Sequence, residues 1–298
     1  MTTLITGARG KVAQGVIARL HASGQAGHDG QVGQAGHDVR AGHAVRAASA
    51  RPDELTVPAG VETSGLALDR PETFAGALDG VRRVFLYPEP AGIHELVKAA
   101  EAAGVEHVVL LSSSSVLGPD AETDPLASHS LRVERALADS SLTCTFLRPD
   151  AFASNSFGWA RAIGRSLPVQ LAYPDAHIAP IHPEDIADIA FEALTGDSLT
   201  GRRVTLTGPE SLTFRAQLAV LSEAIGREIP VERISREEAE RQMSAFMPAP
   251  MVASLLDLWS AAVHGPAAVA DTTETLLGRP ARRYAQWAAE NASAFTGS

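Results

Sequence analysis

Apolar runs of strand length alternate with segments of helical periodicity along the first half of the chain. The strand-like runs cover residues 4–5, 44–48, 81–87, 105–111 and 142–147, and helical segments follow Gly10 and lie near residues 71–78, 93–103 and 128–138. In the segment after Gly10, apolar residues recur at the spacing that forms one stripe along a helix. This alternation predicts a doubly wound α/β fold, in which helices cover a parallel sheet and the ligand lies at the carboxyl ends of the strands.

The second half of the chain is less regular. Residues 205–207 form a strand-like run, and apolar stripes of helical spacing lie over residues 214–225 and 252–263. Both stripes are typical of core packing. We therefore expect a dinucleotide-binding domain over residues 1–150 and a smaller, mixed α/β substrate-binding region over residues 151–298.

Composition narrows the class of protein. The 298 residues are 45% hydrophobic and carry a formal net charge of −10, so nucleic acid is not an expected partner. No apolar run approaches the roughly 20 residues that span a bilayer, and the first residues lack the features of a secretion signal. We expect a cytoplasmic protein without a membrane partner. The single cysteine, Cys144, excludes an internal disulfide, and we expect no metal site.

Residues 24–43 contain a sequence repeat that has two possible interpretations. Residues 24–29 recur as residues 33–38, and residues 41–43 repeat part of the unit again. His28, His37 and His43 are candidates for a metal cluster. The favoured alternative is a tandem duplication in a surface loop, because lengthening such a loop adds little closure entropy.

The segment from Thr6 to Ala13 carries the strongest chemical signal, because it stands where the first strand meets the first helix. Gly7 permits a tight turn, Gly10 allows backbone to approach a pyrophosphate, and Ala13 allows helix and strand to pack closely. The first amides of the helix then face the anion. This arrangement predicts a dinucleotide site.

The end of the second strand favours NADPH over NADH. Sites for NAD usually offer an acidic residue to the ribose, but residues 45–51 contain no carboxylate. Arg51 is a candidate ligand of the 2′-phosphate, with Ser49 and either Lys11 or Arg9 beside it. The alternative for Arg51 is a solvated arginine in a loop.

Several segments together resemble the NmrA-like atypical short-chain dehydrogenase/reductases. They cover residues 6–10, 104–113, 146–149 with Phe152 and Asn155, 180–187, 206–210 and 278–280 with Trp287. The resemblance spans nearly the whole chain apart from the repeated loop. It implies a Rossmann domain, a smaller C-terminal substrate domain, NAD(P)H binding, and reduction of quinones or related carbonyl compounds.

The resemblance also implies roles for individual residues. The expected cofactor-binding residues are Gly7, Arg9, Gly10, Lys11, Val12, Arg51, Leu68, Tyr87 and Pro149. Substrate contacts are expected from Phe152 and Asn155, and Ser113 matches the catalytic serine of the reductases, a task that Ser112 and Ser114 could share. His182 is a further candidate for substrate binding because it lies in the loop just before a helix start, where it could alternatively be structural.

One departure from the reductase pattern bears on the chemistry. No tyrosine is followed four residues later by a lysine, so the usual proton-donating pair is missing. His129 is a candidate proton donor, or alternatively a surface residue of the helix. A quinone acceptor needs less help, because hydride addition yields a stabilised hydroquinone anion that water can protonate.

These patterns favour an NADPH-dependent reductase that transfers hydride to a quinone or conjugated carbonyl compound, with a place in a biosynthetic pathway. The expected substrate is small and hydrophobic, and the chain is expected to be a monomer or homodimer. Two alternatives stay open: a regulatory protein that senses NADP without turnover, and a non-redox cyclase or isomerase on the same fold.

Overall fold

The computed structural model describes residues 1–26 and 44–297. The candidate metal ligands His28, His37 and His43 therefore lie outside the described residues. The chain divides into two compact units. Unit 1 comprises residues 1–113, 129–148 and 186–204, and unit 2 comprises residues 114–128, 149–185 and 205–298.

A seven-stranded sheet forms the centre of unit 1, in the order β3-β2-β1-β4-β5-β6-β9. The strands are β1 (Thr2–Ile5), β2 (Ala44–Ser49), β3 (Glu62–Gly65), β4 (Val81–Leu86), β5 (His107–Leu111), β6 (Thr143–Pro149) and β9 (Arg203–Leu206). Every pairing from β3 to β6 is parallel. The order reverses between β1 and β4, which is the doubly wound Rossmann arrangement and confirms the predicted fold class.

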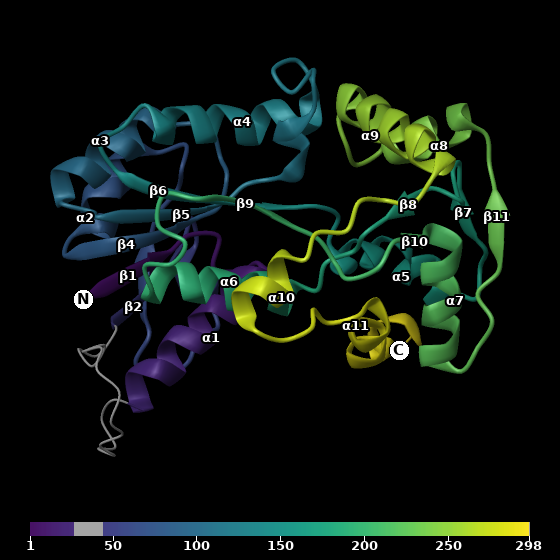
Figure 1. Ribbon diagram of the computed structural model, residues 1–298, viewed down its shortest axis with the longest axis horizontal. Helices are drawn as coiled ribbons and strands as arrows, with labels where there is room; N and C mark the ends of the chain where they lie inside the picture. The colour runs from purple at the N-terminus through teal and green to yellow at the C-terminus, as the bar shows by residue number, and fades with distance from the viewer. Residues whose placement is uncertain (27–43, 298) are drawn as a thin grey trace. The chain divides into compact units, whose positions relative to one another are not determined.

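Helices cover both faces of this sheet (Figure 1). They are α1 (Lys11–Ala26), α2 (Phe74–Leu78), α3 (Ile93–Ala103), α4 (Pro125–Ala138) and α6 (Pro183–Thr195), with 3-10 helices η1 (Pro52–Glu54) and η2 (Pro71–Thr73). Helices α2, α3 and α4 cover one face, where Phe74, Leu96 and Leu137 are buried in one apolar cluster. Helix α1 covers the other face, and its stripe residues Val16 and Ile17 are fully buried.

Unit 2 has its own core and two small sheets. The strands β7 (Val169–Leu171) and β11 (Val231–Arg233) pair in parallel, and β8 (His177–Ile178) pairs antiparallel with β10 (Leu212–Thr213). The helices are η3 (Ser114–Leu117), η4 (Ala153–Trp159), α5 (Ala160–Gly164), α7 (Phe214–Ile225), α8 (Arg236–Met243), α9 (Ala249–Ala261), η5 (Ala262–His264), α10 (Thr272–Leu277), α11 (Tyr284–Glu290) and η6 (Ala292–Phe295). The predicted stripe on α7 is buried against aromatic residues of α11 and η6, so its role in core packing is confirmed.

Two element boundaries and one strand differ from the prediction for local reasons. Helix α4 begins at Pro125 rather than near residue 128, because the Asp124 carboxylate accepts a hydrogen bond from the Leu126 amide at 2.9 Å. Strand β5 begins at His107, because Gly104 ends α3 in the left-handed region. Strand β3 was not expected at all, since its sequence Glu-Thr-Ser-Gly has no apolar residue.

His107 is a titratable group inside the unit 1 sheet. Its Nε2 lies 2.9 Å from the Thr145 hydroxyl, which donates to the Leu199 carbonyl at 2.7 Å. The ring therefore donates to Thr145 and is held neutral. Burial first, and the Arg83 guanidinium second, lower the pKa of His107 from 6.5 to about 4.

This pKa predicts acid sensitivity. Because the unfolded chain binds the proton more readily, the stabilisation is complete above about pH 6.5 and is lost as the pH falls toward about 4, amounting to at most about 3 kcal/mol. Denaturant unfolding across this range should show a steeper loss of stability for the native chain than for the His107→Gln variant. Parallel curves for the two proteins would contradict the assignment.

Candidate cofactor and substrate site

The loop after β1 is fixed to β4 by two hydrogen bonds of Thr6. The Thr6 amide donates to the Phe85 carbonyl at 3.0 Å, and the Thr6 hydroxyl accepts from the Tyr87 amide at 2.7 Å. Gly7 follows with φ +62°, and an added Cβ there would lie 3.0 Å from the Tyr87 Cβ. The turn requires glycine both for its backbone conformation and for the close approach of Tyr87.

The amino end of α1 presents backbone donors directly after this turn. The Gly10 amide donates to the Gly7 carbonyl at 2.8 Å, and the Gln14 amide makes the first helical bond, to the Gly10 carbonyl at 2.9 Å. The amides of Lys11, Val12 and Ala13 precede that bond and have no carbonyl partner within the helix. The first turn has no acidic side chain. These donors and the helix dipole fit the diphosphate of a dinucleotide.

Two of the expected phosphate ligands converge on one carboxylate. Arg51 precedes η1, and its Nη1 lies 2.9 Å from Glu54 Oε1, while Arg9 Nη1 lies 3.3 Å from Glu54 Oε2. All three side chains are exposed. The Arg51 amide also donates to the Ser49 hydroxyl at 3.2 Å. An anion is thus already held between Arg9 and Arg51, and Glu54 was not foreseen in this role.

The remaining cofactor candidates follow other strands. Tyr87 comes directly after β4 and is 53% exposed, which leaves its ring accessible. Leu68 is half-buried in the loop before η2, and its carbonyl would lie 2.3 Å from a Cβ added to Gly92. Pro149 ends β6 and is buried. Position 92 requires a glycine, because its φ is +66° and because an added Cβ would collide with the Leu68 carbonyl.

A buried polar network ties the ends of β5 and β6 to α4. Glu134 of α4 accepts from the Ser112 hydroxyl at 2.5 Å and from Arg148 through two nitrogens, at 2.9 and 2.5 Å. The two-point pairing with Arg148 neutralises a carboxylate that is almost inaccessible to solvent. Because Ser113 directly follows Ser112, this network fixes the position of the expected catalytic serine.

The other expected catalytic and substrate residues have the following environments. Ser113 is half-buried, and the His129 Nε2 lies 3.1 Å from the Pro88 carbonyl, to which it donates. In unit 2, Phe152 precedes η4 and forms a parallel bridge with Ile181, and Asn155 is exposed on η4. Their roles in catalysis and substrate binding stay predictions.

His182 has partners at both ring nitrogens. It is 3% exposed, its Nε2 lies 3.1 Å from Glu290, and its Nδ1 accepts from the Glu184 amide at 3.1 Å. Burial lowers the pKa of His182 from its ordinary value. These contacts engage both nitrogens within unit 2, so a substrate contact by His182 needs one of them to be released.

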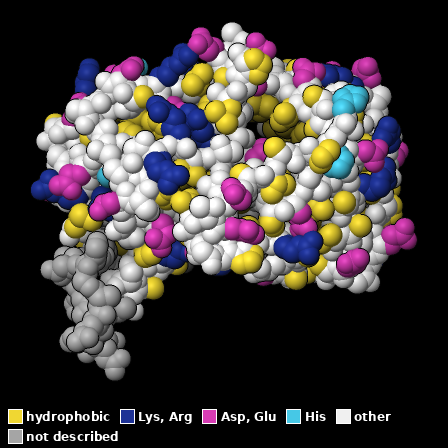
Figure 2. Space-filling model, in the orientation of Figure 1, with side chains coloured by type: hydrophobic (Ala, Val, Ile, Leu, Met, Phe, Trp, Pro, Cys, Tyr) yellow, Lys and Arg dark blue, Asp and Glu magenta, His cyan; other side chains and the backbone are white. Residues whose placement is uncertain are grey.

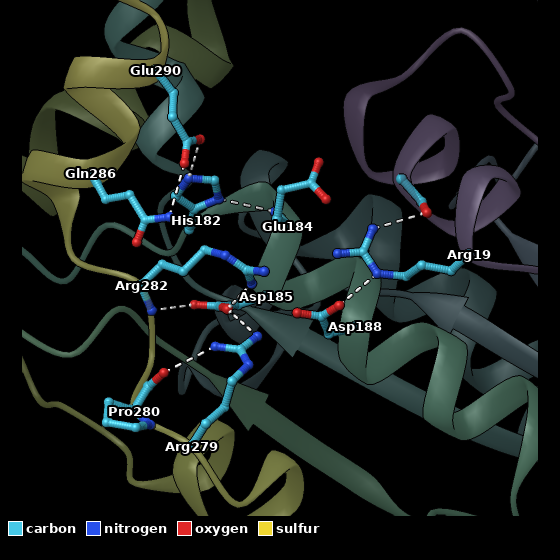
Figure 3. A network of polar contacts seen from close by, with 11 residues as sticks. Arg19, His182, Glu184, Asp185, Asp188, Arg279, Pro280, Arg282, Gln286 and Glu290 are labelled. Atoms are coloured by element: carbon cyan, nitrogen blue, oxygen red, sulfur yellow. Dashed lines mark hydrogen bonds and ion pairs between the residues drawn. The ribbon is translucent and has the colours of Figure 1, made fainter. Parts of the chain in front are cut away.

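Asp185, at the start of α6, is a fully buried carboxylate that holds the C-terminal segment (Figure 3). It accepts from the Arg279 guanidinium at 2.8 Å, and from the Arg282 guanidinium and amide at 2.5 and 2.7 Å. The same segment lines an open cavity of about 480 Å³. The arginine partners of Asp185 lie 94 and 97 residues further along the chain, so no local sequence pattern indicated them.

Comparisons with known proteins agree with this geometry. A family model described as NAD(P)H-binding matches residues 7–197. The (4-alkanoyl-5-oxo-2,5-dihydrofuran-3-yl)methyl phosphate reductase of Streptomyces griseus is 36% identical over 297 residues, which cover 98% of each chain.

Two solved structures show the same fold. Escherichia coli quinone oxidoreductase QOR2 complexed with NADPH has a TM-score of 0.75 at 21% identity, covering 97% of this chain and 99% of that one. NmrA, a negative transcriptional regulator in complex with NADP, has a TM-score of 0.68 at 18% identity, covering 97% and 94%.

The turn after β1 and the reversal of strand order define a Rossmann protein that binds a nicotinamide dinucleotide. The chain belongs to the NAD(P)H-binding family, with NmrA-like atypical short-chain dehydrogenase/reductases as structural neighbours. It is an NAD(P)H-dependent reductase, and the expected family and enzyme class are both confirmed.

Other classes of site find no support in the part of the chain that the structure describes. Residues 1–26 and 44–297 contain no cluster of side chains that could hold a metal ion. Within the same residues, no helix has both the length and the apolar character needed to cross a bilayer. On the face drawn in Figure 2, basic and acidic side chains are interspersed rather than gathered by sign.

Gly7 provides a test of the turn. Gly7→Ala forces a side chain into the left-handed region and against Tyr87, so we expect the free energy of unfolding to fall by about 1–3 kcal/mol. Gly76→Ala, inside α2, is the matched control, because nothing lies within 4 Å of its added Cβ. If denaturant unfolding shows equal stability for both variants, the turn does not need glycine.

Proposed function

We propose that this reductase uses NADPH to reduce either a quinone or a carbon–carbon double bond that is conjugated to two carbonyl groups. The observation that carries the proposal is the composition of α4. This helix stands where short-chain reductases carry tyrosine and lysine, and it contains neither residue. The acceptor must therefore form a stabilised anion that can be protonated without the tyrosine–lysine pair.

Two acceptor classes meet this requirement. Hydride addition to a quinone gives a hydroquinone anion, and hydride addition to an alkene that carries two carbonyl groups on one carbon gives an enolate spread over both oxygens. The name of the Streptomyces griseus relative describes the second class, an alkanoyl-substituted unsaturated lactone that bears a phosphate ester. Its likeness over the full chain supports acyl-substituted unsaturated lactones as substrates here, with quinones as alternative acceptors.

Within this proposal the protein binds the cofactor through two groups, the diphosphate and the 2′-phosphate of the adenosine. The amides of Lys11 and Val12 bind the diphosphate, and Arg9 and Arg51 bind the 2′-phosphate in place of Glu54. When bound, the reduced nicotinamide supplies the hydride. Ser113 donates a hydrogen bond to the substrate carbonyl, and Phe152 and Asn155 contact the rest of the substrate.

A panel of acceptors tests the reaction. Purified protein is mixed with NADPH, and absorbance at 340 nm is followed with four acceptors: a (4-alkanoyl-5-oxo-2,5-dihydrofuran-3-yl)methanol, its phosphate ester, a naphthoquinone and a simple ketone. We expect oxidation of NADPH with the first three acceptors and none with the ketone. Binding of NADPH without oxidation by any of them would favour a sensor, and no binding at all would favour a cyclase or isomerase.

Arg51 tests the preference for NADPH. Arg51→Ala removes a charged hydrogen bond to the 2′-phosphate, so we expect about a 10- to 100-fold rise in the Kd for NADPH and at most about a twofold change for NADH. Arg82→Ala is the matched control, because Arg82 is also an exposed arginine paired with an exposed glutamate, Glu106. Calorimetric titration at fixed ionic strength provides the values. Equal weakening of both cofactors would place the selectivity elsewhere.

A further inference from the structure

Asp150 carries a carboxyl group at the carboxyl end of β6, and no role was expected for it from the sequence. It is the first residue after β6, and its amide donates to the Leu206 carbonyl at 2.9 Å. Its Oδ1 accepts a hydrogen bond from the Ser114 hydroxyl at 3.2 Å. Ser114 opens η3, immediately after the expected catalytic Ser113. The carboxyl is therefore held in place by the segment that follows the neighbouring strand β5.

Asp150 is half-buried and differs from the fully buried carboxylates Glu134 and Asp185 in its charge environment. Glu134 and Asp185 are each neutralised by arginine, whereas Asp150 forms no ion pair with any residue in the described part of the chain. Burial raises the pKa of Asp150, and hydrogen bonds from Ser114 and the Ala151 amide oppose the rise only in part. A carboxyl that is partly removed from water and has no cation beside it shifts toward its protonated form.

Arg148, the cation two residues before Asp150 on β6, is already paired with Glu134 of α4. Helix η3 and residues 205–208 carry no ionisable side chain. Residues 179–182 end in His182, whose two ring nitrogens are engaged by Glu290 and by the Glu184 amide. The side-chain hydrogen bond of the Asp150 carboxyl is the one from the Ser114 hydroxyl.

The position of Asp150 matches the place where the reaction needs a proton. Ligands of open parallel sheets bind outside the carboxyl ends of the strands, and Asp150 and Ser114 follow two adjacent strands there. Reduction of a conjugated acceptor consumes one hydride and one proton. Since α4 has neither tyrosine nor lysine, the usual source of that proton is absent from this helix.

We propose that Asp150, oriented by Ser114, is the proton donor of the reduction. As hydride adds to the β-carbon of the acceptor, the π electron pair moves to the carbonyl oxygen and forms an enolate. The Asp150 O–H bond then breaks, its proton goes to the enolate, and the carboxylate regains a proton from water. With a quinone, the same proton goes to the hydroquinone anion. This inference rests on the proposed function, which supplies the hydride and the acceptor.

The kinetic test compares acceptors whose product anions differ in basicity. A series of quinones is reduced by the native chain and by Asp150→Asn, which keeps an oxygen acceptor for Ser114 but has no acidic proton. For each quinone, the kcat of the native chain is divided by the kcat of Asp150→Asn, which cancels differences in reduction potential among the quinones. We expect the ratio to rise from near unity for the most acidic hydroquinone to about 100-fold for the most basic. The Kd for NADPH should not change.

A purely structural role gives a different pattern. Loss of structure in Asp150→Asn would lower kcat by the same factor for every quinone, and a uniform ratio would overturn the inference. Asp175→Asn is the matched control, because Asp175 is an exposed carboxylate of unit 2 paired with Arg215 and Arg233. We expect this control to show a ratio near unity throughout the series.

A second readout is independent of turnover. The infrared C=O band of a protonated carboxylic acid, taken as the difference between the native chain and Asp150→Asn, should titrate with a midpoint clearly above the ordinary aspartate value of about 3.9. A midpoint at or below that value would overturn the inference even if the reductase activity is present. If the native chain reduces no quinone or unsaturated lactone, the proposed function itself fails, while the infrared midpoint still reports the state of Asp150.

Discussion

The backbone amides at the start of α1 impose the main constraint on unit 1. Amides that precede the first helical bond have no carbonyl partner within the helix, so they need an anion or water. The chain positions them by fixing Thr6 to β4 and by turning sharply at Gly7. Because the strand order reverses between β1 and β4, this turn lies at the switch point where an open sheet leaves room for a ligand.

Buried carboxylates serve different purposes according to the cations around them. Glu134 is paired with Arg148 and holds α4 against the ends of β5 and β6, and Asp185 is paired with Arg279 and Arg282 and holds the C-terminal segment. Both carboxylates are compensated by the arginines that they contact. Asp150 is half-buried and has no such partner, so its partial removal from water raises its pKa and favours the neutral acid form. In this way the distribution of arginines separates structural carboxylates from a group that can transfer a proton.

The elements predicted best from the sequence are those with strong local signals. The parallel sheet, α1, α3 and α7 were predicted because their apolar residues recur with one clear period. Strand β3 was missed because it is a short polar edge strand, and the start of α4 was missed because it depends on the single cap Asp124. The candidate site divides in the same way. The glycine turn is readable from spacing, whereas Glu54 and the Ser114–Asp150 pair come together only through folding.

A crystal structure of the protein with bound NADPH is the most direct test of whether the amides at the start of α1 bind the diphosphate. We expect the diphosphate oxygens to lie within hydrogen-bond distance of the Lys11 and Val12 amides, about 2.7–3.2 Å from each nitrogen. The contrary result would be a complex in which NADPH binds but its diphosphate lies away from these amides, with the start of α1 satisfied by water or by side chains of the protein.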